Sequence, residues 1–331
     1  MSTTARLVPA SSRTLLLTLD AFGTLFHPRL PVPEQYAATA HQFGLSRTAI
    51  TPDKLKAAFK DTFREQARRY PNYGRADVLR GRYGGPRQWW EEVIRGSFTR
   101  ALTADNQPPL GQLQKPEGQV HNHIDLPAGM VEALLDRFAG SEGYALYDDV
   151  VPFFRRMRKL KTAGKFSFDR IIVGVLSNTD DRVPAVLKSL GLEVGDMRAD
   201  QDRSSMELPG FEHRPDANKA EKSLVELSDD NLNVDIDMVI TSYEAGEEKP
   251  HRLIFDVAKR QALRLSRPWI TRGTRFTAIH VGDDLEKDYR ASIAAGCQAY
   301  LMPRDQIMYY EDDVKELDTL LDLADKLELS P

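Results

Sequence analysis

Residues 14–25 read TLLLTLDAFGTL, and this stretch decides the fold. Residues 14–19 form an apolar run with the length and composition of a buried strand in a parallel sheet. Asp20 follows directly, at the strand end where open α/β sheets bind their ligands. Gly23 can adopt backbone conformations closed to other residues, so the chain can turn there and leave the carboxylate exposed. An isolated Asp in this context would more often cap a turn, so the prediction of a site depends on other strand ends.

Two further apolar runs end in polar side chains. Residues 171–176 are followed by Ser177 and Asn178, which for an isolated strand would simply cap the next helix. Residues 278–282 form the other run, and helix capping would also account for the carboxylates after it. Because parallel strands end at the same edge of a sheet, all of these groups are expected to converge. The carboxylates after the third run are Asp283, Asp284 and Asp288.

Lys249 stands before Pro250 at the expected start of a helix. The helix dipole disfavours a cation there unless an anion lies nearby. Carboxylates from separate strands would repel one another unless a cation joined them, and oxygen ligands suit Mg²⁺. With Mg²⁺ and Lys249 neutralising a bound phosphate, Asp20 could attack phosphorus. Ser177 and Asn178 could then donate hydrogen bonds to the oxygens of the transferred group.

The order of these motifs resembles that of the haloacid dehalogenase superfamily, over about residues 15 to 303. The motifs are Asp20-x-x-Gly23-Thr24, Ser177-Asn178, Lys249-Pro250 and Gly282-Asp283-x-x-x-x-Asp288. The resemblance implies that Asp20 is both nucleophile and metal ligand, and that Ser177 and Lys249 hold the phosphoryl group. The implied Mg²⁺ site comprises Asp20, the backbone carbonyl of Phe22, Asp283, Asp284 and Asp288.

Other segments resemble one group within the superfamily, the haloacid-dehalogenase-like hydrolase domain-containing protein 3 group. They include YPNYG at residues 70–74, RQWWEEVI at 87–94, Ser97-Phe98 and TSYEAG at 241–246. This group has no clearly established substrate, so the narrower resemblance concerns ancestry more than activity.

Phe22 departs from the phosphatase pattern of the superfamily, which places a second Asp there as general acid and base. Phenylalanine cannot donate a proton, and losing a general acid costs about 10²- to 10⁴-fold in rate. The 2-haloacid dehalogenases also resemble this chain in having an aromatic residue at that position, but they work without metal and lack the acidic fourth motif. Three hypotheses follow: a Mg²⁺-dependent phosphatase of restricted activity, a dehalogenase, and a protein that binds Mg²⁺ and phosphate without turnover.

The predicted fold is α/β, with a Rossmann-like, mostly parallel sheet, helices on both faces and an inserted helical cap domain. Residues 1–27 and 145–331 would form the core, and residues 28–144 the cap. Residues 196–231 are rich in charged residues and predict a disordered insertion in the core. Asn72 and Tyr73 precede a glycine in a predicted loop of the cap, so they are candidates to face the substrate.

Composition limits the classes of partner. The chain has 331 residues and a net charge of −4, which gives no basic surface for nucleic acid. No apolar stretch approaches the length of a membrane span. The single cysteine, Cys297, fits a reducing compartment, the cytoplasm or alternatively the nucleus. The expected partner is a small molecule, a phosphorylated metabolite, whereas the sequence indicates no particular oligomeric state.

Overall fold

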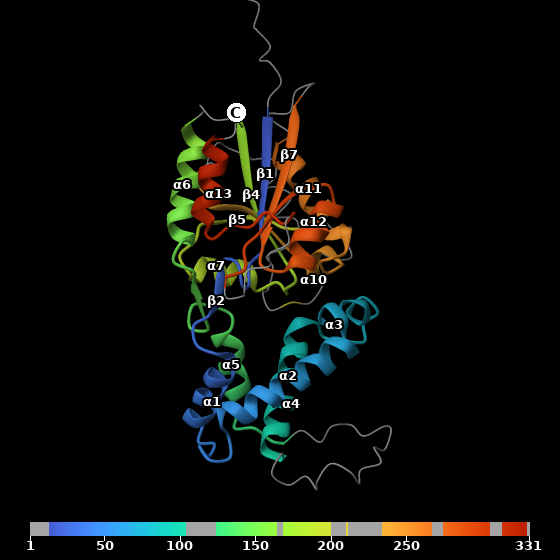
Figure 1. Cartoon of the computed structure of the whole chain (residues 1–331). Coiled ribbons are helices and arrows are strands. Elements are labelled where there is room, and N and C mark those ends of the chain that lie inside the picture. The colour runs from blue at the N-terminus through green and yellow to red at the C-terminus, as the bar shows by residue number, and fades with distance from the viewer. Residues whose placement is uncertain are drawn as a thin grey trace, which may run out of the picture.

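The computed structural model describes residues 13–103, 124–163, 168–199, 210, 234–266, 274–304 and 313–329. Its centre is a six-stranded sheet of order β5-β6-β4-β1-β7-β8, in which every neighbouring pair is parallel. Helices cover both faces of this sheet, and a separate group of helices lies beyond one end of its strands (Figure 1). The predicted α/β fold with a parallel sheet and a helical insert is confirmed. The strands are β1 (Arg13–Leu19), β4 (Arg170–Ser177), β5 (Val194–Met197), β6 (Ile236–Thr241), β7 (Arg275–Gly282) and β8 (Gln298–Leu301).

The register of the strands brings their carboxyl ends to one edge. Leu19 of β1 lies opposite Val175 of β4 and Val281 of β7. On the far side of β4, Ser177 pairs with Thr241 at the end of β6. The residues that follow these strands are therefore neighbours in space although they are far apart in sequence.

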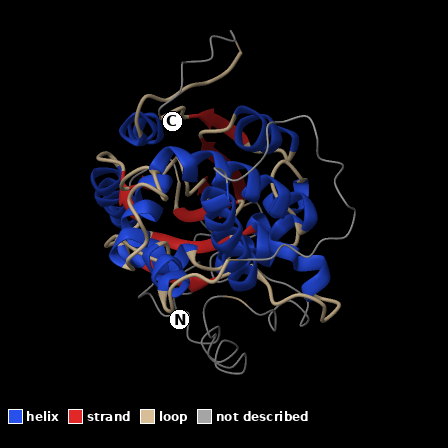
Figure 2. Cartoon of the chain, turned by 90° about the horizontal axis from the view of Figure 1, so that it is seen from below, coloured by secondary structure: helices blue, strands red, loops and turns tan. Residues whose placement is uncertain are grey.

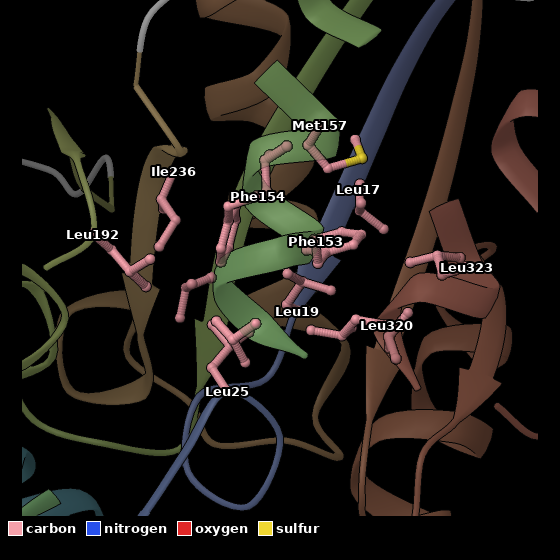
Figure 3. Packing of buried hydrophobic residues seen from close by; sticks show 14 of the residues in the cluster. Leu17, Leu19, Leu25, Phe153, Phe154, Met157, Leu192, Ile236, Leu320 and Leu323 are labelled. Carbon is pink, nitrogen blue, oxygen red and sulfur yellow. The ribbon is translucent and has the colours of Figure 1, made fainter. Parts of the chain in front are cut away.

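Alternate side chains of β1 enter two different cores, which explains why consecutive residues of this strand, Leu15, Leu16 and Leu17, are all apolar. Leu17 and Leu19 pack with α6 and α13 on one face of the sheet (Figure 3). Leu16 packs on the other face with α11, where Phe255 is fully buried. The helices of these layers are α6 (Val150–Ala163), α7 (Val183–Ser189), α10 (Ser242–Ala245), α11 (Arg252–Ser266), the π-helix η4 (Leu285–Arg290), α12 (Ala291–Ala294) and α13 (Leu320–Leu329).

The helical group below the sheet is reached through a short antiparallel ribbon of β2 (Phe26–Pro28) and β3 (Tyr144–Leu146). The predicted cap boundaries, between residues 27 and 28 and between 144 and 145, fall within this ribbon. Seen along the strands from this end, the helices lie across the sheet (Figure 2). They have their own core, which includes the buried residues Phe98 and Leu134. The group comprises α1 (Val32–Gln42), α2 (Pro52–Arg69), α3 (Pro71–Val78), α4 (Pro86–Thr103) and α5 (Met130–Arg137).

Local sequence explains where some of these helices start and bend. The Thr51 hydroxyl caps α2 by accepting a hydrogen bond from the Lys54 backbone N–H, and Pro52 occupies the first turn. The assigned helix α3 contains left-handed residues, with φ of 46° at Asn72, 59° at Tyr73 and 73° at Gly74. The predicted loop is therefore a kinked helical turn.

The predicted insertion at residues 196–231 starts two residues too early, because Asp196 and Met197 belong to β5. Most of that segment, residues 200–209 and 211–231, lies outside the described residues. Within the described parts of the chain, each helix is too short or too polar to cross a lipid bilayer.

Candidate active site at the carboxyl edge of the sheet

Lys249 lies at the centre of a buried polar cluster. Its ammonium donates to Asp20 Oδ1 at 2.6 Å and to Asp288 Oδ1 at 2.5 Å. The third donated bond goes to the backbone carbonyl of Leu176, at 3.0 Å. Asp20 follows β1, Leu176 lies in β4 and Asp288 lies in the π-helix η4. The ammonium therefore joins three elements, and it is only 2% exposed.

Burial and mutual repulsion perturb the titration of this cluster. Burial raises the pKa of Asp20 to about 6, with the Asp288 and Asp283 carboxylates adding to the rise and the Lys249 ammonium opposing it. Burial and the Asp288 carboxylate raise the pKa of Asp283 to about 6 as well. Burial also opposes the ionisation of Asp288, but Lys249 and His280 outweigh it and hold the pKa of Asp288 well below its usual range. The site therefore concentrates more negative charge than one ammonium can neutralise.

The carboxylates fit a divalent cation. Asp20, Asp283 and Asp288 each offer an oxygen, and the three oxygens lie within 4.8 Å of one another. Two glycines make room for this approach. A Cβ on Gly23 would lie 2.6 Å from Asp283 Oδ2, and one on Gly282 would lie 2.2 Å from Asp288 Cγ. Oxygen ligands from a crowded, anionic group are the donor set that Mg²⁺ accepts.

Ser177 and Asn178, the two polar residues predicted at the end of β4, have different surroundings in the structure. Ser177 is buried on the pocket wall, and no hydrogen-bond partner is found for its hydroxyl within the described parts of the chain. Asn178 was expected to donate to a transferred group. Its amide instead donates to the Lys249 carbonyl at 2.8 Å and accepts from the Lys249 N–H at 2.6 Å. Asn178 thus fixes the backbone that carries Lys249.

Asp284 was expected among the metal ligands, but the structure does not bring its side chain into the carboxylate group. Its Oδ1 accepts from the backbone N–H groups of Glu286 at 3.0 Å and Lys287 at 2.8 Å. It therefore caps η4, which is the alternative that the sequence left open for this cluster. Its own backbone N–H donates to Asp288 Oδ2 at 3.1 Å, so it supports the site through the main chain.

A pocket of about 470 Å³ opens between this edge of the sheet and the helical group. Phe22 lines it, and 46% of this residue is exposed. The Phe22 ring makes edge contacts with Phe26 and Tyr144, at centroid distances of 6.0 and 6.2 Å. The position two residues after the candidate nucleophile therefore presents an aromatic ring where the superfamily phosphatases would present a carboxyl group.

The helical group is bonded to the sheet edge by residues of α3. The Asn72 amide donates to the carbonyls of Ser242 at 2.9 Å and Gly246 at 3.2 Å, and its oxygen accepts from the Ser242 hydroxyl. Arg75 Nε donates to the Tyr243 carbonyl at 2.9 Å. Of the two predicted substrate residues, Tyr73 lines the pocket, whereas Asn72 holds the two parts of the chain together.

A buried ion pair in the pocket was missed in the sequence. Asp180 accepts from Arg182 Nε at 2.9 Å and Nη2 at 2.8 Å, and from Trp90 Nε1 at 2.8 Å. Burial opposes ionisation of Asp180, but Arg182 and the hydrogen bonds outweigh it and lower the pKa of this carboxyl. The only signal in the sequence was an Asp-x-Arg spacing that any helix cap would share.

His280 of β7 was also missed. It is fully buried, and its Nε2 lies 3.1 Å from Asp288 Oδ1. Its Nδ1 lies 2.9 Å from the Thr18 hydroxyl of β1. His280 thus orients Asp288 from within the sheet. A histidine inside an otherwise apolar run was a visible signal, because such a polar side chain needs a partner when it is buried.

Sequence comparison finds relatives from different vertebrates that carry the same name. No protein-family model matches the sequence. The haloacid dehalogenase-like hydrolase domain-containing protein 3 of Xenopus laevis is 27% identical over 290 residues, 87% of this chain and 83% of that protein. The Homo sapiens protein of the same name is 26% identical over 287 residues, 87% of this chain and 81% of that protein.

Solved structures with a similar arrangement are more distant. The HAD-hydrolase YfnB from Bacillus subtilis, bound to magnesium, has a TM-score of 0.48 at 15% identity, over 96% of this chain and 100% of that one. A HAD phosphatase from Thermococcus onnurineus has a TM-score of 0.40 at 16% identity, over 95% of this chain and 97% of that one. Likenesses of this degree carry no conclusion about activity.

Proposed function

Because this chain belongs to the haloacid dehalogenase superfamily, we propose that it is a Mg²⁺-dependent hydrolase that acts on phosphorylated small molecules through an aspartyl-phosphate on Asp20. One observation carries the proposal: Asp20, Asp283 and Asp288 meet around Lys249 at the carboxyl edge of the sheet. Such a group can hold a cation and a phosphoryl group side by side.

The first chemical step belongs to Asp20. Its carboxylate attacks phosphorus, an O–P bond forms, and the bond from phosphorus to the leaving oxygen breaks with its electron pair on that oxygen. Lys249 positions Asp20 and, with the Ser177 hydroxyl, contributes positive charge and a hydrogen bond to the phosphoryl oxygens. Water then attacks phosphorus, the bond from phosphorus to the Asp20 oxygen breaks with its electron pair on the carboxylate, and the water proton leaves on the released phosphate or passes to solvent.

Asp20 and Asp283 are the residues proposed to hold Mg²⁺, together with the backbone carbonyl of Phe22. When bound, the ion offsets the negative charge that gathers on the phosphoryl oxygens. Asp288 contacts both Lys249 and His280, so its proposed contribution is to hold the ammonium in place as well as to complete the acidic group.

Phe22 restricts which substrates can react. The residue cannot protonate a departing alkoxide, so alkyl phosphates lose the roughly 10²- to 10⁴-fold contribution of a general acid. Acyl phosphates and aryl phosphates need little protonation, because their leaving groups are already stable as anions. The proposed activity is therefore confined to donors of this kind.

Acetyl phosphate is the substrate that tests this function, because it combines a good leaving group with a small organic part. The purified full-length chain should release phosphate from it with Mg²⁺ and stop when EDTA is added. Asp20→Asn should abolish the release, whereas Asp284→Asn should retain most of it, because the Asp284 side chain caps η4.

Halide release tests the second candidate, which the aromatic Phe22 favours because a departing halide needs no proton. Chloride from 2-chloropropionate or fluoride from fluoroacetate, with no phosphate from acetyl phosphate, would replace the phosphatase proposal with a dehalogenase. Neither product, together with tight Mg²⁺ binding, would favour a binding protein without turnover.

A further inference from the structure

We propose that the substrate of this site is a monophosphate of an aromatic, otherwise uncharged organic group. This proposal rests on the proposed phosphatase function and names the class of substrate that the pocket selects. Three observations carry it: the aromatic wall of the pocket, the pairing of every cation in its lining, and its uncharged hydroxyl groups.

Apart from the carboxylates, much of the pocket lining is apolar and aromatic. Phe59 and Phe63 of α2 and Trp90 of α4 contribute to it from the helical group, and Phe22 contributes from the loop after β1. Phe63 and Trp90 lie at a centroid distance of 5.9 Å, so the rings form a continuous surface. A volume of about 470 Å³ is enough for a ring system beyond the phosphate, since small-molecule pockets span roughly 300–1,000 Å³.

The cations of the pocket are already paired. Among the described lining residues, Lys249 contacts Asp20 and Asp288, Arg182 contacts Asp180, and Lys287 lies 3.4 Å from Asp284. A carboxylate or second phosphate on the substrate would therefore have to compete with an existing carboxylate for its counter-charge, and burying an uncompensated charge is costly. The cationic side chains are also fewer than the carboxylates, which are Asp20, Asp180, Asp283, Asp284 and Asp288.

Arg182 is the residue that would otherwise receive a substrate carboxylate. Its Nε and Nη2 groups already donate to the buried Asp180 carboxylate. Its guanidinium lies 5.1 Å from the Trp90 ring centroid. Breaking this pair would leave the Asp180 carboxylate buried and uncompensated, which is strongly unfavourable. The pairing thus disfavours sugar bisphosphates, phosphoglycolate and 2-haloacids as a class.

Three tyrosines supply uncharged polar groups. Tyr36, Tyr73 and Tyr144 line the pocket, and no hydrogen-bond partner is found for their hydroxyls among the residues that the structure describes. Burial raises the pKa of Tyr73 and raises that of Tyr144 to about 12, so both hydroxyls keep their protons at neutral pH. They suit a hydroxyl, ether or carbonyl on the organic group, in addition to the aromatic ring.

The test compares substrates whose leaving groups are similar but whose charges differ. With Mg²⁺ and the full chain, kcat/KM for phenyl phosphate should exceed that for 4-carboxyphenyl phosphate by about tenfold or more. In calorimetry, benzylphosphonate, which cannot be hydrolysed, should bind about 10- to 100-fold more tightly than methylphosphonate, as expected for burying one ring. Equal kcat/KM for the two esters, or equal or undetectable binding of the two phosphonates, would overturn the proposal.

A variant of the wall adds a test of charge. Phe63→Lys introduces a cation into the pocket lining, so it should lower the preference for phenyl over 4-carboxyphenyl phosphate by about tenfold. Phe63→Met is the matched control, because it keeps an apolar side chain and should keep the preference. An unchanged preference in a folded Phe63→Lys protein would count against the proposal. If this variant fails to fold, the two phosphonates with the unmodified chain still decide the matter.

Acetyl phosphate separates the failure of this inference from the failure of the proposed function. Turnover of acetyl phosphate without any preference among the aryl esters would leave the phosphatase in place and remove only the substrate class. Absence of all turnover would remove the phosphatase, while the phosphonate measurements would still show whether the pocket selects an aromatic ligand whose only charged group is its phosphonate.

Discussion

Replacing Phe22 by Asp tests whether the missing general acid limits this site. The new carboxyl group would stand beside Asp20 and could protonate a departing alkoxide. A complete general acid contributes about 10²- to 10⁴-fold, and an engineered one is expected to recover part of that, about ten- to a thousandfold in kcat/KM for an alkyl phosphate. Acetyl phosphate, which needs little protonation, should change far less.

The substitution also has two costs that can be worked from the structure. The Phe22 ring makes two edge contacts, with Phe26 and Tyr144, and losing both should destabilise the fold by about 1–3 kcal/mol. The added negative charge near Asp20 and Asp283 should increase the demand for Mg²⁺, so the assay must use saturating Mg²⁺.

Phe22→Asn is the matched control, because it loses the same ring and has a similar size but carries no carboxyl proton. The assay measures kcat/KM of both variants for a sugar phosphate and for acetyl phosphate. If folded Phe22→Asp gains nothing over Phe22→Asn on the sugar phosphate, the general acid does not limit the reaction. The dehalogenase or the binding protein would then be the better hypothesis.

Three other perturbations probe single contacts. Asp283→Asn should weaken Mg²⁺ binding sharply in calorimetry, whereas Asp284→Asn should change it little; equal affinities in wild type and Asp283→Asn would remove Asp283 from the site. Trp90→Phe removes a donor to buried Asp180 and should lower the free energy of unfolding in urea by about 1–3 kcal/mol, an effect that should shrink in an Asp180→Asn background. His280→Leu leaves Asp288 with one donor fewer and should cost a similar amount, and His280→Gln should recover part of it; identical stabilities would contradict the orienting contact.

The sheet and its polar edge could be predicted because β1, β4 and β7 are largely apolar runs that are followed by or end in polar groups. Leu15, Leu16 and Leu17 are apolar for the same reason, burial on both faces, so the parallel sheet follows from composition alone. The position of Asp20 near Asp283 then follows from the parallel register of β1 and β7.

The partners of individual polar side chains could not be predicted in the same way. Asn178 and Asp284 have the right types for a phosphate donor and a metal ligand, but each finds a closer backbone partner in the folded chain. Trp90 and Asp180 are 90 positions apart, and only the packing of α4 against the sheet edge brings them together. The local sequence around a polar residue cannot show which hydrogen-bond partner it takes when a chemically equivalent partner lies on a distant element.

The hydrogen bonds between the helical group and the sheet edge limit how often the two parts of the chain separate. Among the residues that the structure describes, Asn72, Arg75 and Trp90 make at least five hydrogen bonds across this junction. At about 0.5–1.5 kcal/mol net for each, separating the two parts costs about 2.5–7.5 kcal/mol before any apolar surface is exposed. A separated state would then account for at most about one or two molecules in a hundred at equilibrium. Most encounters with a ligand would therefore involve the arrangement in which the pocket is already assembled.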